Sequence, residues 1–215
     1  GRAREAGLHF GLPELFDAPT VAKLARRVAE TGPPAEEPAA REPFALVPAE
    51  DRDRLPAGLE DAYPMAELQI GMVYEQQRDP DRNPYHNVES LPMAGRFDAA
   101  VFRRALALVV RRHPVLRTSL ALTGYREPLQ LVHADADLPL TVTDLRGQDA
   151  AAQRAALREA VRTAHATPFP LDSAPLMRMA VHVLADDAYQ WTVTEHHAIL
   201  DGWSVASTLA EIADV

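Results

Sequence analysis

The stretch "EHHAILDGWS", residues 195–204, brings together side chains that could do chemistry. Two adjacent histidines, His196 and His197, are followed closely by Asp201 and Gly202. A neutral imidazole can take a proton from an amine or a hydroxyl nucleophile, and it titrates near neutral pH. Two interpretations follow from the residues alone: a catalytic histidine at a strand-to-helix turn, or a buried histidine with a structural role.

The spacing in this segment argues against a metal site and against a serine triad. If a strand continues through His197, the two imidazoles point to opposite faces, because side chains alternate along a strand. The chain has no His-Glu-x-x-His motif, and its lack of cysteine excludes thiolate ligands and a cysteine nucleophile. Ser204 lies on the helix side of the turn and is poorly placed for a triad. A lone imidazole remains.

The elements that must position this imidazole are predicted from hydrophobic patterning. "LMRMAVHVL" and "YQWTVTEHH", joined by Asp186 and Asp187, predict a hairpin of two buried strands that leads into the histidines. Asp98 is the expected N-cap of a helix that Pro114 ends, and another helix is expected after Gly202. Further helices are predicted over 65–78 and 149–165, and further strands near 86–94, 116–122, 128–134 and 138–144. This mixture predicts a layered α/β or α+β sandwich.

Composition narrows the function classes. The chain has 215 residues, of which 47% are hydrophobic, so it can bury a core. Its net charge of -9 argues against binding to nucleic acid, which needs a basic face. No long apolar run or signal segment is present, so we expect no membrane span and a cytoplasmic location.

A change in composition predicts the domain organisation. Residues 31–57 combine six prolines with alanine and glutamate, which is typical of an extended linker. Before it, residues 1–30 hold a short apolar element and a helix with an apolar stripe at Val21, Leu24 and Val28. Residues 58–215 are expected to form the main domain.

Several separated motifs resemble one family. "HHAILDGWS" matches the HHxxxDG signature of the condensation domains of nonribosomal peptide synthetases. In the order expected for that family, the chain also contains "YPMAELQIGMVYE" (63–75), "RRHPVLRTSL" (111–120), "EPLQLV" (127–132) and "PFPLDSAPLMRM" (168–179). The resemblance covers residues 58–215. It implies a chloramphenicol-acetyltransferase-like lobe, one half of a V-shaped condensation domain whose tunnel lies between two lobes. A single lobe is expected to keep the catalytic histidine but to be inactive alone.

The resemblance also implies a reaction. In this family the second histidine of the signature is the catalytic one, which corresponds to His197. The amine of an acceptor aminoacyl thioester attacks the acyl or peptidyl thioester of a donor, and an amide bond forms. The histidine either takes the amine's proton or holds the nucleophile and the tetrahedral intermediate by hydrogen bonding. Trp203 is expected to be a packing residue and not a substrate contact.

The other signature residues are expected to support His197. His196 is expected to be structural. Asp201 resembles the family's salt-bridged aspartate, with Arg112 as its expected partner and Arg117 as the alternative. Arg112 could instead be a cation at a helix end that interacts with the helix dipole. Gly202 is expected to allow a close approach of backbone.

The N-terminal residues resemble a different domain. "FGLPELFDAPTVAKLA" (10–25) is similar to the last helices of a peptidyl carrier protein, so residues 1–30 are interpreted as a carrier remnant. The carrier serine that bears the phosphopantetheine arm is expected upstream, and no cofactor is expected on the condensation lobe. Substrates would arrive on the 4'-phosphopantetheine arms of an upstream donor carrier and a downstream acceptor carrier. A C-terminal lobe and an adjacent adenylation domain are the other expected partners.

Alternatives to this interpretation are open. The particular residues in these motifs favour a condensation domain that takes a donor ending in a D-residue and an acceptor of the L configuration. An epimerisation domain of the same superfamily would share the fold and the histidines but would abstract a Cα proton. A free-standing CoA-dependent acyltransferase is disfavoured by the carrier-like segment. A lobe that only docks carrier proteins would be non-catalytic.

Overall fold

The computed structural model describes residues 7–8, 10–31, 41–79, 82 and 84–215, and the chain divides into two compact units. The first unit is Gly1–Glu42 and the second is Pro43–Val215. In the first unit, the described residues form the helices α2 (Leu12–Asp17) and α3 (Val21–Thr31). Proline in the first turn of α2 fits its start, because the first N–H groups of a helix have no partner within it.

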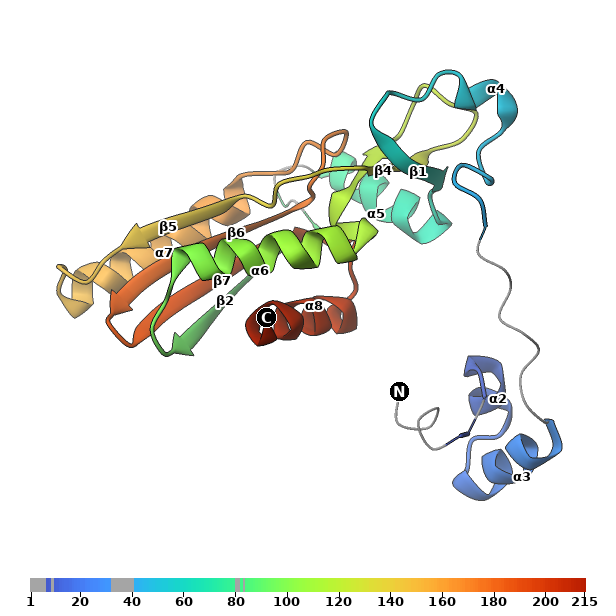
Figure 1. Ribbon diagram of the computed structural model, residues 1–215, viewed down its shortest axis with the longest axis horizontal. Helices are drawn as coiled ribbons and strands as arrows, with labels where there is room; N and C mark the ends of the chain where they lie inside the picture. Colours follow the sequence, from blue (N-terminus) through green and yellow to red (C-terminus); the bar gives the residue numbers. More distant parts are fainter. Residues whose placement is uncertain (1–6, 9, 32–40, 80–81, 83) are drawn as a thin grey trace. The chain divides into compact units, whose positions relative to one another are not determined.

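The second unit is built around a four-stranded sheet (Figure 1). β6 and β7 form the antiparallel hairpin predicted from the sequence, β2 pairs antiparallel with β7, and β5 pairs parallel with β6. In sheet order the strands are β2 (His86–Ala94), β7 (Ala188–His196), β6 (Met177–Ala185) and β5 (Leu140–Asp144). The central β7 is therefore held on both sides by a full strand, and this rigid strand leads directly into the histidine segment.

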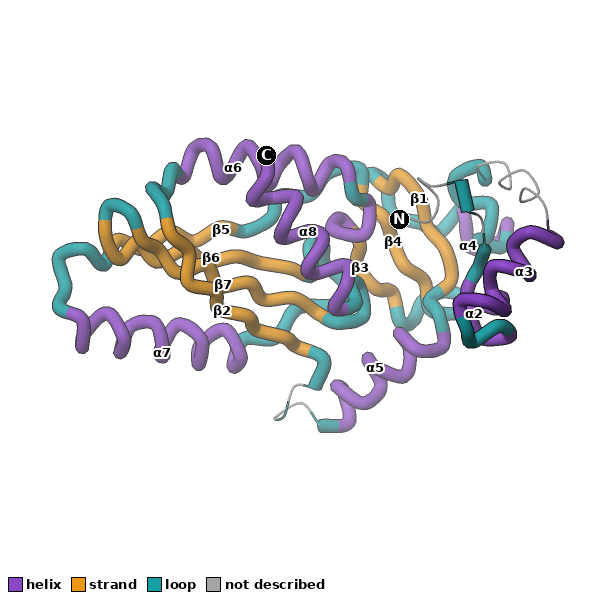
Figure 2. Tube along the Cα trace, turned by 90° about the horizontal axis from the view of Figure 1, so that it is seen from below, coloured by secondary structure: helices purple, strands orange, loops and turns teal. Residues whose placement is uncertain are grey.

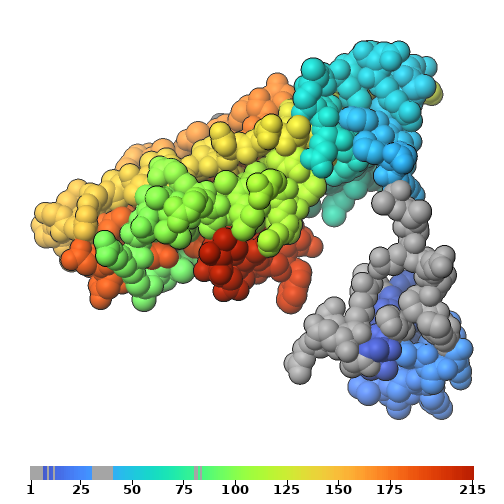
Figure 3. All heavy atoms as spheres, in the orientation of Figure 1, coloured from blue at the N-terminus to red at the C-terminus, as the bar shows by residue number. Residues whose placement is uncertain are grey.

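Helices cover both faces of this sheet (Figure 2). The helices α6 (Ala99–Arg112) and α8 (Gly202–Asp214) contribute apolar side chains to the same core as β6 and β7, while α7 (Ala150–Ala166) contacts β2 and β7. The core includes Leu106, Val109, Leu209, Val181 and Trp191. The space-filling view shows α8 in dark red directly against α6 in green (Figure 3).

The predicted start of α6 is confirmed. The carboxylate of Asp98 accepts hydrogen bonds from the backbone N–H groups of Ala100 and Val101, at 2.8 and 3.1 Å. These bonds satisfy donors that have no partner inside the helix. The helix ends before Pro114, which begins the 3₁₀ turn η1 (Pro114–Arg117). The whole expected helix is therefore present with its expected cap.

A smaller antiparallel sheet lies beside the first. Its strands, in order, are β1 (Leu59–Pro64), β4 (Leu129–His133) and β3 (Thr118–Ala121). The helix α5 (Glu67–Arg78) follows β1 and is tied to the histidine segment: Nε2 of Gln69 donates to the carbonyl of Ala198 at 2.8 Å. The small sheet and α5 thus support the loop after β7.

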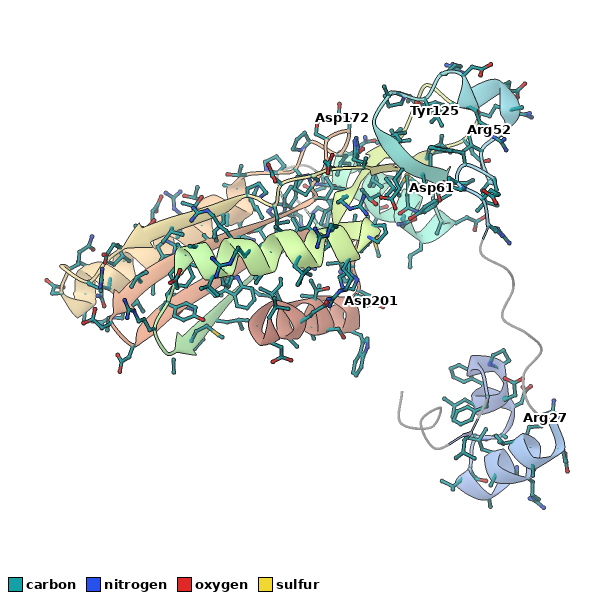
Figure 4. All side chains as sticks on the ribbon, in the orientation of Figure 1. Arg27, Arg52, Asp61, Tyr125, Asp172 and Asp201 are labelled. Atoms are coloured by element: carbon teal, nitrogen blue, oxygen red, sulfur yellow. The ribbon has the colours of Figure 1, made fainter. Side chains whose placement is uncertain are left out.

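The predicted linker extends too far, because its second half is folded. Residues from Pro43 belong to the second unit, and they include the short helix α4 (Ala49–Arg52). Val47 is only 1% exposed and packs on β1 and β4 together with Phe44 and Leu55. The carboxylate of Asp61 on β1, labelled in Figure 4, accepts the Phe44 N–H at 2.5 Å. Isolated apolar residues among prolines carry no periodic pattern, so the sequence does not reveal that a sheet covers them. Residues 32–40 of the expected linker lie outside the described residues.

The described residues of the second unit form two sheets with packed helices, which confirms the predicted α/β or α+β sandwich. Among the helices described, none is both long enough and apolar enough to cross a lipid bilayer. The fold delivers one central strand, β7, to a turn that is braced by α5 on one side and α8 on the other.

Candidate active site at the end of strand β7

The two histidines occupy different environments at the end of β7. The His196 side chain is fully buried and has partners for both ring nitrogens. Nδ1 accepts the backbone N–H of Ala198 at 3.1 Å, so Nε2 carries the proton and donates to Oε1 of Gln76 at 2.6 Å. Burial, together with the nearby imidazoles of His86 and His197, lowers the pKa of His196 to about 4. His196 is therefore neutral near pH 7 and braces the turn.

His197 is the more accessible of the pair, with its side chain 32% exposed. Its backbone N–H donates to the carbonyl of Tyr85 at 2.8 Å, which extends the pairing between β7 and the chain before β2 by one residue. Tyr85 has φ of 68°, a left-handed conformation that is uncommon for a bulky residue. The strand end is thus closed by a strained backbone position, and the His197 ring stands at the edge of the core.

Two residues that the sequence did not single out contact the His197 ring. Asn87 on β2 lies directly opposite Glu195 on β7, and Nδ2 of Asn87 donates to Oε1 of Glu195 at 2.6 Å. The same Nδ2 is 3.3 Å from Nδ1 of His197. Glu195 could have been suspected, since it lies two residues before His197 on the same strand face. Asn87 could not, because its position depends on the register between β2 and β7.

Glu195 is an unusual carboxylate. The residue is 3% exposed, and its Oε2 is a buried oxygen without a hydrogen-bond partner in the described structure. Burial raises its pKa, although the hydrogen bond from Asn87 and the nearby His197 act in the opposite direction. A buried polar atom without a partner is costly and is often found at functional sites.

Asp201 has a different role from the one the sequence suggested. It is the N-cap of α8, and its carboxylate accepts the backbone N–H of Ser204 at 2.7 Å (Figure 4). That hydrogen bond is the main reason why the pKa of Asp201 is lowered. Within the described part of the chain Asp201 forms no ion pair, so the expected bridge to Arg112 or Arg117 is wrong for this structure.

The two arginines are directed elsewhere by the packing. Arg112, in the last turn of α6, pairs with Glu211 near the end of α8, well beyond Asp201 at its start. Arg117 follows the 3₁₀ turn, which sends its side chain into the small sheet. There it is 4% exposed, donates to Oε2 of Glu60 at 2.6 Å and also donates to the carbonyl of His133. Arg117 is a buried structural cation.

Gly202 and Trp203 also differ from expectation. Among the described residues, a Cβ at Gly202 would meet no atom within 4 Å, so no close backbone approach there explains this glycine. Trp203 is 82% exposed and is not a packing residue within this chain. The buried face of α8 is formed by Val205, Thr208 and Leu209, and Trp203 lies two residues before that stripe, on the other side of the helix.

The surroundings do not form a metal site. In the part of the chain that the structure describes, no three His, Cys, Asp or Glu side chains are placed so that they could hold a metal ion. A hollow of about 740 Å³ runs along α6, lined in part by Arg103, Arg111 and Leu138, but its lining includes no residue of the histidine segment. The chemistry available at the end of β7 is that of an accessible imidazole backed by an amide and a buried carboxylate.

Known proteins with similar sequences are synthetases and synthases that are much longer than this chain. The family model for the condensation domain matches residues 59–215. The AMB antimetabolite synthetase AmbE of Pseudomonas aeruginosa is 40% identical over 99% of this chain, and one of the linear gramicidin synthase subunits of Brevibacillus parabrevis is 34% identical over 96%. The chain spans only 10% of the first relative and 4% of the second.

Solved structures agree with this assignment. The starter condensation domain of rhizomide synthetase RzmA is 25% identical, with a TM-score of 0.64 over 72% of this chain and 38% of that chain. The four-domain nonribosomal peptide synthetase AB3403 shares the fold at 22% identity, with a TM-score of 0.63 over 75% of this chain and 12% of that chain. The family model and the relatives show that this chain belongs to the condensation domain family of nonribosomal peptide synthetases.

Proposed function

We propose that this chain supplies the catalytic histidine, His197, of an amide-bond-forming condensation domain. The donor is an acyl or peptidyl thioester and the acceptor is the amine of an aminoacyl thioester, each on the phosphopantetheine arm of a carrier protein. The amine nitrogen attacks the thioester carbonyl carbon, the C–S bond breaks, and the proton lost from nitrogen balances the thiol that leaves. The condensation lobe itself needs no cofactor for this exchange.

One observation carries the proposal. His197 is the partly exposed member of the histidine pair, and it is held at the end of a central strand within the segment that the condensation family model covers. The neighbouring His196 is buried and neutral and braces the turn. Holding two tethered reactants beside one positioned imidazole can supply about 7–11 kcal/mol of the barrier through orientation alone.

Exposed apolar side chains support the proposal that this lobe packs against a second lobe. Trp203 on α8 is 82% exposed, and Leu68 and Tyr74 on α5 are 70% and 63% exposed. Both helices adjoin the loop that follows His197. We propose that a C-terminal lobe covers this side and completes the tunnel, so that the 215 residues alone are inactive.

The described residues of the first unit support a carrier domain that precedes this lobe in the sequence. Its described helices leave Phe16 77% exposed and Val21 88% exposed, as expected for part of a larger helical module. The similarity to AmbE extends over 99% of the chain and therefore includes these helices. We propose that residues 1–30 end a donor carrier domain, with an acceptor carrier and an adenylation domain as further partners. A preference for a donor ending in a D-residue and for an L-acceptor is part of the proposal, and only the residues of the sequence motifs support it.

The test uses an enzyme that contains both lobes and two loaded carriers. Intact-mass spectrometry follows transfer of the donor to the acceptor in the parent and in His197→Ala, in D₂O as well as in H₂O. We expect amide formation in the parent and a roughly 10²–10⁴-fold loss in the variant. His165→Ala, on the exposed side of α7, is the matched control and should transfer normally. Deuterium at the donor Cα without transfer would indicate epimerisation, and neither signal would indicate a docking lobe.

A further inference from the structure

The Asn87 side chain bridges the buried carboxylate and the His197 ring. Its Nδ2 is 2.6 Å from Oε1 of Glu195 and 3.3 Å from Nδ1 of His197. The carboxylate oxygen itself is 3.8 Å from Nδ1, which is too far for a hydrogen bond. Glu195 therefore acts on the ring directly only through its charge, and the hydrogen-bonded link between the carboxylate and the ring is the Asn87 amide.

The direction of these hydrogen bonds follows from which atoms carry protons. Oε1 of Glu195 accepts, so the NH₂ end of the Asn87 amide must face it, and the amide cannot turn over without placing two oxygens against each other. An amide NH₂ group only donates. Nδ1 of His197, which faces the same NH₂ group, must therefore offer its lone pair. In the neutral ring the proton then resides on Nε2.

We propose that Asn87 and Glu195 are positioning residues that hold neutral His197 as its Nε2–H tautomer. The inference rests on the proposed function for its consequence, since Nε2 is the ring nitrogen left for the reactants. An Nε2–H group donates a hydrogen bond and cannot accept the amine's proton at that atom. His197 then stabilises the oxygen that gains charge as the amine adds to the thioester carbonyl. The proton leaves the amine nitrogen for the departing sulfur or for water.

The buried position of Glu195 explains why the bridge is directional. Its side chain is 4% exposed and its Oε2 is without a partner, so within the described structure the Asn87 amide is the side chain that satisfies this carboxylate. Turning the amide over would remove that hydrogen bond from a desolvated oxygen, which is unfavourable. The carboxylate thus orients the amide, and the amide sets the tautomer.

Nitrogen NMR on the 215-residue chain tests the tautomer without any assay of activity. With ¹⁵N-labelled histidine, two-bond ¹H–¹⁵N spectra at mildly alkaline pH distinguish protonated from unprotonated ring nitrogens, and loss of a signal in His197→Ala assigns His197. We expect Nε2 to carry the proton in the parent. His196 is an internal standard, because its own bonds require an Nε2–H ring. A parent spectrum with the proton on Nδ1 of His197 would overturn the proposal.

A reciprocal exchange provides the sharper test. Asn87→Asp combined with Glu195→Gln places the carboxylate next to His197 and the amide in the buried position. The size and shape of the two side chains change very little. The new carboxylate can only accept, so we expect the His197 proton to move to Nδ1, while the His196 signals stay unchanged and report an intact fold. A tautomer that stays on Nε2 with intact His196 signals would refute the role of Asn87.

Should the exchanged protein lose the His196 signals, Asn87→Leu removes the donor while leaving Glu195 in place. We then expect the Nδ1–H form of His197 to increase relative to the parent, and an unchanged tautomer ratio would contradict the proposal. Ser90→Ala, which alters a hydrogen bond farther along the same strand pair, is the control and should leave His197 as in the parent.

The two-lobe enzyme separates this inference from the proposed function. If the parent enzyme forms amide, we expect the exchanged pair to lower kcat about 10²–10³-fold, as removal of one donor to a developing oxyanion does. Full kcat in the exchanged pair would overturn the donor role. If the parent forms no amide while the NMR spectra are as expected, the proposed function fails and the positioning of His197 stands.

Discussion

The buried His196 makes the stability of this protein depend on pH. Its side chain is fully buried, and both ring nitrogens are hydrogen-bonded in a way that only the neutral ring allows. The pKa of His196 is about 4 in the folded protein, against 6.5 for an ordinary histidine. Between these values the unfolded chain binds a proton that the folded chain excludes. Stability is therefore expected to fall as the pH falls from about 6.5 toward 4.

The size of the effect follows from the shift. A difference of one pKa unit corresponds to about 1.4 kcal/mol, so the full contribution of His196 is about 3 kcal/mol below the folded pKa. Between about pH 7.5 and about pH 4.5, linkage gives a loss of about 2.5 kcal/mol from this residue. That is a large fraction of the typical stability of a domain, which is about 5–15 kcal/mol.

Urea unfolding of the parent and of His196→Gln at both pH values isolates the contribution of His196. The variant is expected to be less stable at neutral pH, because packing and hydrogen bonds are lost. On acidification, however, it should lose about 2.5 kcal/mol less than the parent. His133 and His182 also have lowered pKa values, but they titrate in both proteins and cancel in the comparison. Equal losses in parent and variant would refute the account of His196.

Three further predictions concern stability and are measured by urea unfolding. Asp201→Ala should destabilise the second unit, and Asp201→Ser should do so by less, because serine also caps helices; equal losses would contradict the capping role. Arg117→Leu should cost about 2 kcal/mol, because the buried Arg117 guanidinium donates to Glu60 and to the carbonyls of Val110 and His133. Arg112→Leu should cost less, because the Arg112 side chain is 55% exposed, and similar losses would refute this distinction. A protein that begins at Pro43 should unfold like the parent's second unit, whereas one that begins at Gly58 should be less stable by about 2 kcal/mol or more. If the proteins that begin at Pro43 and at Gly58 were equally stable, residues 43–57 would be linker, as the sequence predicted.

Local patterns predicted most of the elements in the second unit. The alternation of apolar residues along 176–197 identified the hairpin, because the alternate apolar side chains of both strands pack into the core that α6 and α8 share. The stripe on α6 and its cap at Asp98 could also be predicted, because both depend only on residues two to four positions apart in the sequence. The family resemblance rested on short contiguous motifs of this kind, and the family model confirms it.

Local patterns did not predict which residues of the irregular segments are buried. Phe44, Val47 and Leu55 are scattered among prolines, and only the small sheet beneath them shows that they are core residues. The prediction that Asp201 pairs with Arg112 or Arg117 was wrong for a similar reason. A long flexible cation can reach several acceptors, and the choice of Glu211 or Glu60 depends on how α6 and the following turn are packed.

By itself, the sequence indicated that the two histidines face opposite ways if the strand continues through His197, because side chains alternate along a strand. It did not determine what each imidazole would meet. The register between β2 and β7 places Asn87 against Glu195, and the packing of α5 places Gln76 against His196. These contacts join residues about a hundred positions apart. Their geometry, and with it the proton positions proposed for the site, exists only once the sheet is assembled.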